Sequence, residues 1–337
     1  LLSAATEILY LNNSLDSSSF IDLIRQFSSV SIELKYPSEN FKGTYDIASD
    51  IKRLQVTKLK LAVSISGLSS TDEMFKKCKV INSVKLDSSV NAIGKNSFRS
   101  CSSLVYVSIS STVNSIGNDA FRKCAALTQM TLPPSVISIG DGAFSKCTTL
   151  KSITIPSSVK SIGEWAFNEC SSLKTLTIPD SVVSIGEWAF SACSSLKQFV
   201  IPPSVKSIPV STFADCTALV KVTIPNSVTS IGNWAFCKCS ALSEVQIPSS
   251  VTSVGEGAFS KCFALFEIEI PNKVTSIRSS TFAECSSLER VTVPSSVTTI
   301  EDNAFSGCFS LGKISLPRSV TSIGYWSFPS NTIISND

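Results

Sequence analysis

Histidine is absent from the sequence, and its absence rules out several kinds of site at once. A chain without histidine has no Ser-His-Asp or Cys-His catalytic arrangement, and it lacks the commonest zinc ligand. Charge is scarce as well: charged residues make up 16% of the 337 residues, and 29 basic against 26 acidic residues leave a net charge of +3. This balance supplies no dense basic patch, so we expect neither nucleic acid nor an anionic membrane as a partner.

Long hydrophobic runs are also missing. No apolar run approaches the roughly 20 residues that a membrane-spanning helix needs. The opening LLSAATEILYL is shorter than that and has no basic stretch before it. We therefore expect no membrane insertion within this chain. Hydrophobic residues nevertheless make up 43% of the sequence, which favours a sizeable core over disorder.

Cysteine is the first residue whose placement shows order. Eleven of the 12 cysteines follow one another at intervals of 23 residues, from Cys78 to Cys308, and only Cys237 lies off this series. A fixed spacing of this size is typical of a solenoid, in which each unit is one coil. Each unit approximates C-x-x-L-x-x-V-x-I-P-x-S-V-x-S-I-G-x-x-A-F-x-x, and all of them contain the phenylalanine: Phe98, Phe121, Phe144, Phe167, Phe190, Phe213, Phe236, Phe259, Phe282, Phe305 and Phe328.

The periodicity changes within a unit, which predicts its local structure. Leu173, Leu176 and Ile178 alternate with threonines, as in a short strand. Pro179 ends that strand, because proline has no N–H to donate to a neighbouring strand. A shorter apolar run follows, and Gly186 then marks a tight bend. We expect each unit to form one coil with a strand on one side.

The repeat resembles the leucine-rich repeat of the BspA-like type, found in bacterial and trichomonad surface proteins, over residues 78 to 328. The resemblance implies an α/β leucine-rich-repeat solenoid with a parallel sheet on its concave face and short strands or 3-10 turns on its convex side. It also implies binding or adhesion at a microbial cell surface rather than catalysis. The expected domains are an N-terminal capping subdomain, residues 1–54, and the solenoid, residues 55–337, which comprises a degenerate unit (55–77), eleven units (78–330) and a short terminal strand (331–337).

One coil is too small to enclose a core, so its inward side chains must find partners on the coils on either side. The eleven regularly spaced cysteines then stack as small buried hydrophobes; disulfides or a metal are the alternatives. Cys237 occupies a position held elsewhere by Ser, Arg, Asn or Ala, which predicts an exposed thiol. We expect no metal and no cofactor, because Cys237-x-Cys239 is the one close-spaced cysteine pair in the chain.

Charged residues at outward strand positions are sorted along the expected solenoid. Lysines come in the middle coils and glutamates follow them: Lys151, Lys174, Lys197, Lys221, Glu244, Glu267, Glu269 and Glu289. Like charges one strand spacing apart repel each other, so folding alone does not favour this order. We interpret the concave face as a binding surface for a protein or glycan partner; a solvated sheet face is the alternative.

Tryptophan forms a second column, two residues before the phenylalanine of a unit: Trp165, Trp188, Trp234 and Trp326. Trp165 and Trp188 belong to adjacent units and should touch. The same position elsewhere holds Asn, Asp, Gly or Ser, which indicates an outward side chain. Because tryptophan is enriched at binding hot spots, Trp165, Trp188 and Trp234 form a candidate interaction edge; packing against the neighbouring turn is the alternative.

Each end of a solenoid needs a cover, because its last strand is otherwise an open edge. The stretch SSSFIDLIRQF predicts a short capping helix and SVSIELKYP a strand, whereas NTIISND predicts one uncapped strand at the other end.

From the repeat, its resemblance and the charged strand face together, we expect a non-enzymatic binding or adhesion module, at the cell surface or secreted. The alternatives are a structural or scaffold protein that self-associates through its C-terminal edge, and a cytoplasmic location.

Overall fold

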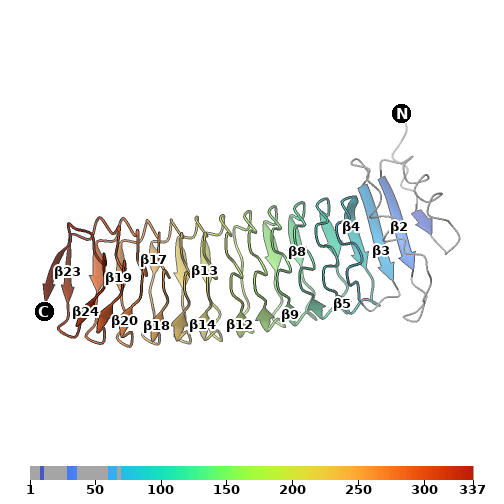
Figure 1. Ribbon diagram of the computed structural model, residues 1–337. Helices are drawn as coiled ribbons and strands as arrows, with labels where there is room; N and C mark the ends of the chain where they lie inside the picture. Colours follow the sequence, from blue (N-terminus) through green and yellow to red (C-terminus); the bar gives the residue numbers. More distant parts are fainter. Residues whose placement is uncertain (1–7, 11–28, 36–59, 67–69, 337) are drawn as a thin grey trace. The chain divides into compact units, whose positions relative to one another are not determined.

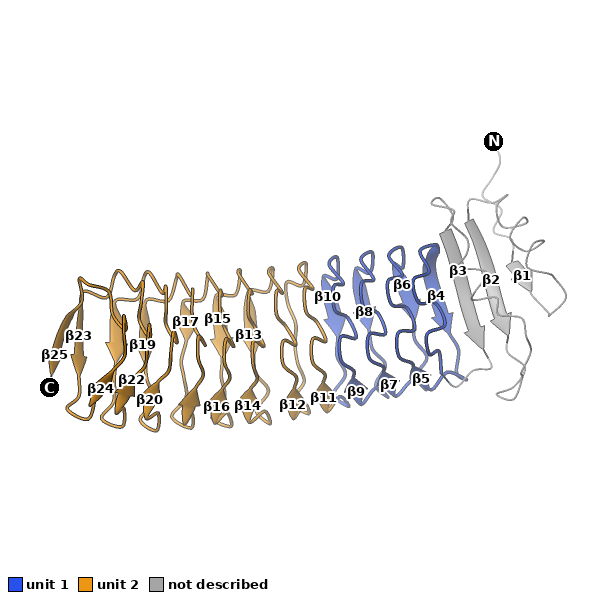
Figure 2. Cartoon of the chain, in the orientation of Figure 1, with its two compact units in different colours: residues 1–159 blue, residues 160–337 orange. Residues whose placement is uncertain are grey.

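The computed structural model describes residues 8–10, 29–35, 60–66 and 70–336. The chain divides into two compact units, residues 1–159 (unit 1) and residues 160–337 (unit 2), which are coloured separately in Figure 2. The predicted boundary at residue 54 and the helix predicted for SSSFIDLIRQF both lie outside the described residues. They stay predictions.

Unit 1 is built of parallel strands. One sheet has the order β1-β2-β3-β4-β6, a second joins β5, β7 and β9, and a third joins β8 and β10. The strand predicted in SVSIELKYP is confirmed as β2, which pairs with β3 over seven residues. The bounds are β1 (Ile8–Tyr10), β2 (Ser29–Lys35), β3 (Lys60–Ser66), β4 (Ile81–Leu86), β5 (Ala92–Ile93), β6 (Tyr106–Ser108), β7 (Ser115–Ile116), β8 (Gln129–Thr131), β9 (Ser138–Ile139) and β10 (Ser152–Thr154).

Unit 2 repeats the same coil, and its strands form two rows (Figure 1). The row that we call the strand face contains β13 (Gln198–Val200), β15 (Lys221–Thr223), β17 (Glu244–Val245), β19 (Glu267–Glu269), β21 (Arg290–Thr292), β23 (Lys313–Leu316) and β25 (Ile333–Asn336). The short-strand side contains β11 (Ser161–Ile162), β12 (Ser184–Ile185), β14 (Ser207–Ile208), β16 (Ser230–Ile231), β18 (Ser253–Val254), β20 (Ser276–Ile277), β22 (Thr299–Ile300) and β24 (Ser322–Ile323).

The pairing confirms the predicted parallel-sheet solenoid. From β11 to β24, paired residues lie 23 positions apart, as in Lys221 opposite Glu244, so each coil stacks in register on the next. The coil from Cys170 is a partial exception. Leu173, Leu176 and Ile178 are buried as predicted, but the predicted strand is absent from this coil.

No helix occurs among the described residues, and none of them therefore forms a helix long and apolar enough to cross a membrane. The expectation of α/β units with 3-10 turns is corrected accordingly. In the turn segment of one coil, the N–H groups of Trp165, Phe167 and Glu169 donate to carbonyls of the next coil at 2.8–2.9 Å. The alternate N–H groups of Ala166, Asn168 and Cys170 turn back to a carbonyl three residues earlier. Because donors alternate between two coils, and because φ is +57° at Trp165 and Glu169, no helical run can form.

Phenylalanine forms the centre of each core. From Phe75 to Phe305 every phenylalanine of the repeat position is 0% exposed. Within unit 2 the neighbouring rings stack at 5.2–5.7 Å between centroids, from Phe167 to Phe328. Stacking along the axis buries what a single coil would leave exposed, as the repeat predicted.

The cysteines form an inward row beside these rings, which confirms that prediction. All 12 lie within the described residues, all are buried and none forms a disulfide. The thiol of Cys193 donates to the carbonyl of Phe167 in the preceding coil, at 3.3 Å, and the other coils repeat this contact. Burial raises the pKa of the Cys147 and Cys193 thiols to about 12. These thiols are therefore neutral structural groups.

The prediction of an exposed Cys237 thiol is wrong, because the residue is only 9% exposed. Burial raises the pKa of the Cys237 thiol. The charged groups of Lys238, Asp215, Lys261 and Glu284 all lie close enough to influence it. Its position is therefore flanked by two ion pairs, Lys238–Asp215 and Lys261–Glu284, each at 3.3 Å.

Gly186 is needed for space, not for the bend that the sequence suggested. Its φ is not positive, but a Cβ there would lie 2.4 Å from the backbone N of Glu164 in the preceding coil. Its N–H donates to the carbonyl of Ile162 at 2.9 Å. Pro209 takes the same position one coil later and has no N–H to donate. This missing donor accounts for the interruption of the short-strand ladder between β12 and β14.

Candidate functional site

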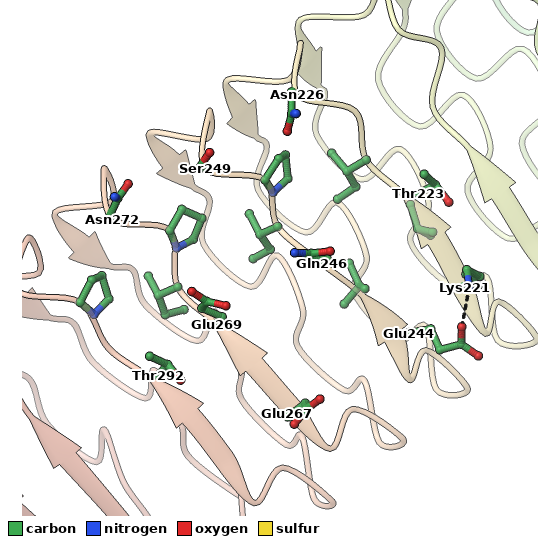
Figure 3. A pocket seen from close by; sticks show the side chains of 18 of the residues that line it. Lys221, Thr223, Asn226, Glu244, Gln246, Ser249, Glu267, Glu269, Asn272 and Thr292 are labelled. Carbon is green, nitrogen blue, oxygen red and sulfur yellow. Dashed lines mark hydrogen bonds and ion pairs between the residues drawn. The ribbon is translucent and has the colours of Figure 1, made fainter.

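A groove of about 820 Å³ crosses the strand face of unit 2, between β15 and β21 (Figure 3). Its polar lining comes from four successive coils: Lys221, Thr223, Asn226, Ser243, Glu244, Gln246, Ser249, Glu267, Glu269, Asn272 and Thr292. Apolar residues that follow the strands, among them Pro248, Pro271 and Pro294, complete it. The prolines that end the strands thus form one border of the groove.

The groove lies where the sheet is interrupted. The ladder of β13, β15 and β17 ends at β17, and β19 pairs only with β21. Strand β17 has two residues, and Gln246 follows where the neighbouring strands continue with Thr223 or Glu269. Val245 is half-buried, whereas Val222 and Ile268 at the same position are 3% and 5% exposed. Strand β17 is therefore paired on one side only, and the groove lies over this break in the sheet.

Two ion pairs lie on either side of the interruption. The Nζ of Lys221 is 2.7 Å from Glu244 Oε2, and Arg290 Nη2 is 2.5 Å from Glu267 Oε2. Each pair joins directly opposite residues of paired strands, which is where side chains on a sheet meet. All four side chains are at least half exposed, so each pair contributes no more than about 1 kcal/mol.

Arg290 also covers an aromatic ring. Its guanidinium carbon lies 4.5 Å from the ring centroid of Phe266, which is 38% exposed. The same guanidinium donates to Glu267 through Nε and Nη2. Arg290 thus contacts two consecutive residues of the neighbouring coil, the ring of Phe266 and the carboxylate of Glu267.

The structure brings only part of the predicted charged set together. Lys221, Glu244, Glu267 and Glu269 line the groove. Lys174 and Lys197 are exposed on coils that precede it, and Lys151 is exposed in unit 1. The lysines also fall into two columns, because Lys221 stands one position further along its coil than Lys197.

The ion pairs correct the argument from repulsion. Glu244 and Glu267 each have a basic partner on a neighbouring coil, so the glutamates do not simply repel one another. Among the described residues, no side-chain partner is found for Lys174, Lys197 or Glu269. These three remain the charged groups available to a ligand on this face.

The available groups donate and accept hydrogen bonds but do not suggest catalysis. The carboxylate of Glu269 and the amides of Gln246, Asn226 and Asn272 point into or along the groove (Figure 3). In the part of the chain that the structure describes, no cluster of three or more His, Cys, Asp or Glu side chains could hold a metal. The groove therefore suits recognition of a polar ligand.

Sequence reasoning missed several groove residues. Asn226, Ser249 and Asn272 each follow the proline of a coil, and Gln246 replaces the usual threonine. The signal was a polar residue at one repeated position, directly after the strand. Arg290 was missed because its role depends on Phe266 and Glu267 in the coil before it.

The tryptophan column lies at backbone positions that disfavour tryptophan. φ is between 53° and 58° at Trp165, Trp188, Trp234 and Trp326. This left-handed conformation costs about 1–2 kcal/mol for most L-residues and suits Gly, Asn and Asp, which explains the Asn, Asp and Gly found at the same position of other coils. The pattern of small polar residues was therefore a signal for backbone conformation as well as for exposure.

The indoles are both exposed and packed on the following turn. The rings of Trp165 and Trp188 stack at 4.8 Å between centroids and 3° between planes, as the sequence predicted. Trp165 is 41% exposed and Trp234 36%. The Trp234 ring fills the space that a Cβ of Gly257 would need in the next coil. Packing on the neighbouring turn is thus found for Trp234, and the interaction edge stays a prediction.

A family model described as the BspA type leucine rich repeat region matches six copies along the chain, over residues 53–136, 114–229 and 206–335. No curated protein matches the sequence significantly.

Several solved structures resemble the chain. A leucine-rich repeat protein from Bacteroides ovatus is 27% identical over 82% of this chain and 92% of its own, with a TM-score of 0.50. A leucine-rich repeat protein from Eubacterium ventriosum is 25% identical over 80% of this chain and 90% of its own, with a TM-score of 0.49. A leucine rich cell surface protein from Faecalibacterium prausnitzii is 29% identical over 87% of both chains, with a TM-score of 0.45.

Proposed function

The chain belongs to the BspA-type leucine-rich repeat family, and from this premise we propose that it is a non-enzymatic module that binds a protein partner through the strand face of unit 2. The observation that carries the proposal is the groove between β15 and β21, whose Glu269 and Gln246 face solvent beside two internal ion pairs. A rigid, repeated surface of this kind presents polar groups at fixed spacing to a partner.

Charge supports a partner of defined polarity. Lys174 and Lys197 occupy the same position on adjacent coils, about 4.8 Å apart by strand spacing. The acidic side chain of Glu269 lies beyond them along the same face. A partner with an acidic segment facing the lysines and a basic or amide group facing Glu269 would match this order. Such complementarity governs the association rate and the choice of partner more than raw affinity.

Catalysis is a weaker interpretation of the same surface. Acid–base chemistry needs positioned carboxylates in a site that excludes water. Glu244 and Glu267 are engaged in ion pairs, and their side chains are 57% and 65% exposed. The family is also one of binding modules.

Reversing the charge of the lysines tests the proposal. Peptides that bind the wild-type chain are first selected from a displayed library, and are then measured against the Lys174→Glu/Lys197→Glu variant. The matched control is Lys160→Glu/Lys206→Glu, which reverses two exposed lysines on the short-strand side of unit 2. We expect the first variant, and not the control, to lose most of the selected peptides. Equal retention by both variants would reject the strand face as the binding surface.

Location and the form of the partner are part of the proposal. We propose action at the cell surface or after secretion, because surface proteins are what the family resemblance implies. Adhesion is the proposed outcome of binding, and a glycan is the alternative ligand, since the amides of the groove also suit hydroxyl groups. Binding of the purified chain to intact cells, with and without glycosidase treatment, separates a protein ligand from a glycan.

A scaffold function is the second candidate. The coil of residues 308–336 exposes Ile323 (48%), Trp326 (78%) and Ile333 (67%), whereas Ile208, Ile231 and Ile277, at the position of Ile323, are each 2% exposed. Such an apolar surface could stack on another protein or on a second copy. Mass measurement over a wide concentration range tests this: a monomer at every concentration removes self-association.

A further inference from the structure

The coil that begins at Cys239 and the coil that begins at Cys262 are not joined by a backbone ladder on either face. On the strand face, β17 pairs with β15 and β19 pairs with β21, but β17 and β19 do not pair with each other. On the short-strand side, the ladder likewise ends at β18 and starts again at β20. We call this boundary the coil break. Both faces are therefore interrupted between the same two coils.

Individual N–H groups show the same interruption. At the boundary before the coil break, the N–H of Thr252 donates to Thr229 at 2.9 Å, and that of Gly255 donates to the same preceding coil at 2.8 Å. Thr275 and Arg278 occupy these two positions one coil later. Among the described residues, neither of their N–H groups has a carbonyl partner on the coil before it. The coil break thus leaves backbone groups unpaired that the other boundary satisfies.

The turn segments hold the two coils together. The N–H groups of Gly257, Phe259 and Lys261 donate to carbonyls of the next coil at 2.8–3.0 Å. Close to them, the N–H of Ala264 donates back to the Ser240 carbonyl at 3.1 Å. The prolines that end the strands lie half a coil away from these bonds in the sequence. The coil break can therefore widen at the prolines while the turn segments stay bonded.

The groove of the strand face lies over the coil break (Figure 3). Its lining includes Glu244, Val245 and Gln246 on one side of the break, and Glu267 and Glu269 on the other. The facing edges of β17 and β19 thus have no strand partner in the groove. An unpaired strand edge is a template for another strand, and main-chain hydrogen bonds to such an edge give affinity for an extended peptide.

The repeat and the charge of the groove indicate which side chains such a peptide would carry. In the coil before the groove, Val222 is buried and Lys221 exposed, so strands here alternate apolar inward and polar outward residues. Glu244, Glu267 and Glu269 are exposed beside the coil break. We propose that the coil break takes up an extended segment of a protein partner as an added strand between β17 and β19, with apolar residues inward and basic residues beside the glutamates. This inference rests on the proposed strand-face function and names the kind of segment that is bound.

The probe is the fluorescein-labelled peptide LVKVKI, which copies residues 219–224 with lysine in place of Thr223. Its anisotropy is titrated with the whole chain at fixed ionic strength, and we expect saturable binding. The same peptide with N-methyl groups on alternate backbone amides keeps its side chains but loses those N–H donors, so it should bind about tenfold more weakly. Glu269→Gln should weaken binding of LVKVKI a few-fold. The matched control Glu256→Gln, at an exposed glutamate of a turn segment, should leave it unchanged.

A disulfide clamp tests whether the coil break must open. Thr252→Cys/Thr275→Cys places two exposed thiols on the short-strand side across the break, and their oxidation ties the two Cα atoms within about 7 Å of each other. The matched control is Thr275→Cys/Thr298→Cys across the next boundary, where the N–H of Thr298 already donates to Thr275 at 2.9 Å. We expect the oxidised clamp to lose binding of LVKVKI and reduction to restore it, whereas the oxidised control should bind like wild type.

Three results would each overturn the proposal: wild type does not bind LVKVKI, the N-methylated peptide binds equally well, or the oxidised clamp binds like the oxidised control. These outcomes are distinguishable from a failure of the strand-face function. If Lys174→Glu/Lys197→Glu loses the library peptides while LVKVKI does not bind to wild type, the added strand is rejected and the strand face is retained as the binding surface.

Discussion

Alkaline pH should destabilise unit 2, because its buried thiols stay neutral at pH values at which exposed thiols ionise. Burial raises the pKa of Cys193 and Cys308 from an ordinary value of 9.0 to about 12. Between these two values the unfolded chain binds fewer protons than the folded chain, so the free energy of unfolding falls as pH rises. Each thiol contributes about 1.4 kcal/mol per pH unit in this window. These two alone therefore remove about 3 kcal/mol at about pH 10, and their full contribution is present below pH 9.

Urea unfolding at a series of pH values from about 7 to about 10, under reducing conditions, measures this effect. The four tryptophans all belong to unit 2, so their emission reports the unfolding of that unit. The variant Cys193→Ala removes one titrating group. We expect the difference in the free energy of unfolding between this variant and wild type to change by about 1.4 kcal/mol in favour of the variant between about pH 7 and about pH 10.

The control is Val228→Ala, which opens a cavity at a fully buried position without removing a titrating group. Its difference from wild type should not change with pH. A wild-type free energy that stays constant from pH 8 to pH 10 would refute the reasoning. So would a Cys193→Ala difference that is independent of pH, because neither result is compatible with thiols buried in the folded chain.

Three further results are expected. Phe236→Ala should lower the free energy of unfolding, measured with urea, by about 3–5 kcal/mol, because the ring is 0% exposed. Phe309→Ala, at a residue 71% exposed, should lower it by under about 0.5 kcal/mol. Equal losses in the two variants would contradict the stacked core. Gly186→Ala should destabilise by about 1–3 kcal/mol, since its Cβ would meet backbone at 2.4 Å, whereas Gly312→Ala meets nothing within 4 Å and should be neutral. Iodoacetamide should alkylate no cysteine of the native chain near neutral pH but all 12 after denaturation, as counted by mass spectrometry. Several alkylated cysteines in the native chain would show that the cysteine row is open to solvent.

The sequence determined which side chains face inward. The interval of 23 residues, the constant phenylalanine and the inward cysteines were all predicted, and Phe236 and Cys193 are buried as expected. The touching of Trp165 and Trp188 followed from the same register. These properties depend on the alternation of residues within one coil and on its exact repetition, and both can be counted along the chain.

Only the tertiary structure decided what happens between coils. Whether Glu244 is free or paired depends on which residue of the neighbouring coil lies opposite, and that residue is Lys221. The role of Gly186 likewise depends on the backbone of Glu164. The turn segments do not form helices, because alternate N–H groups donate to carbonyls of the next coil. The groove at Gln246 arises where such pairing fails. Contacts 23 residues apart fix these features, because hydrogen bonds and ion pairs form only when two coils bring their partners within a few ångströms.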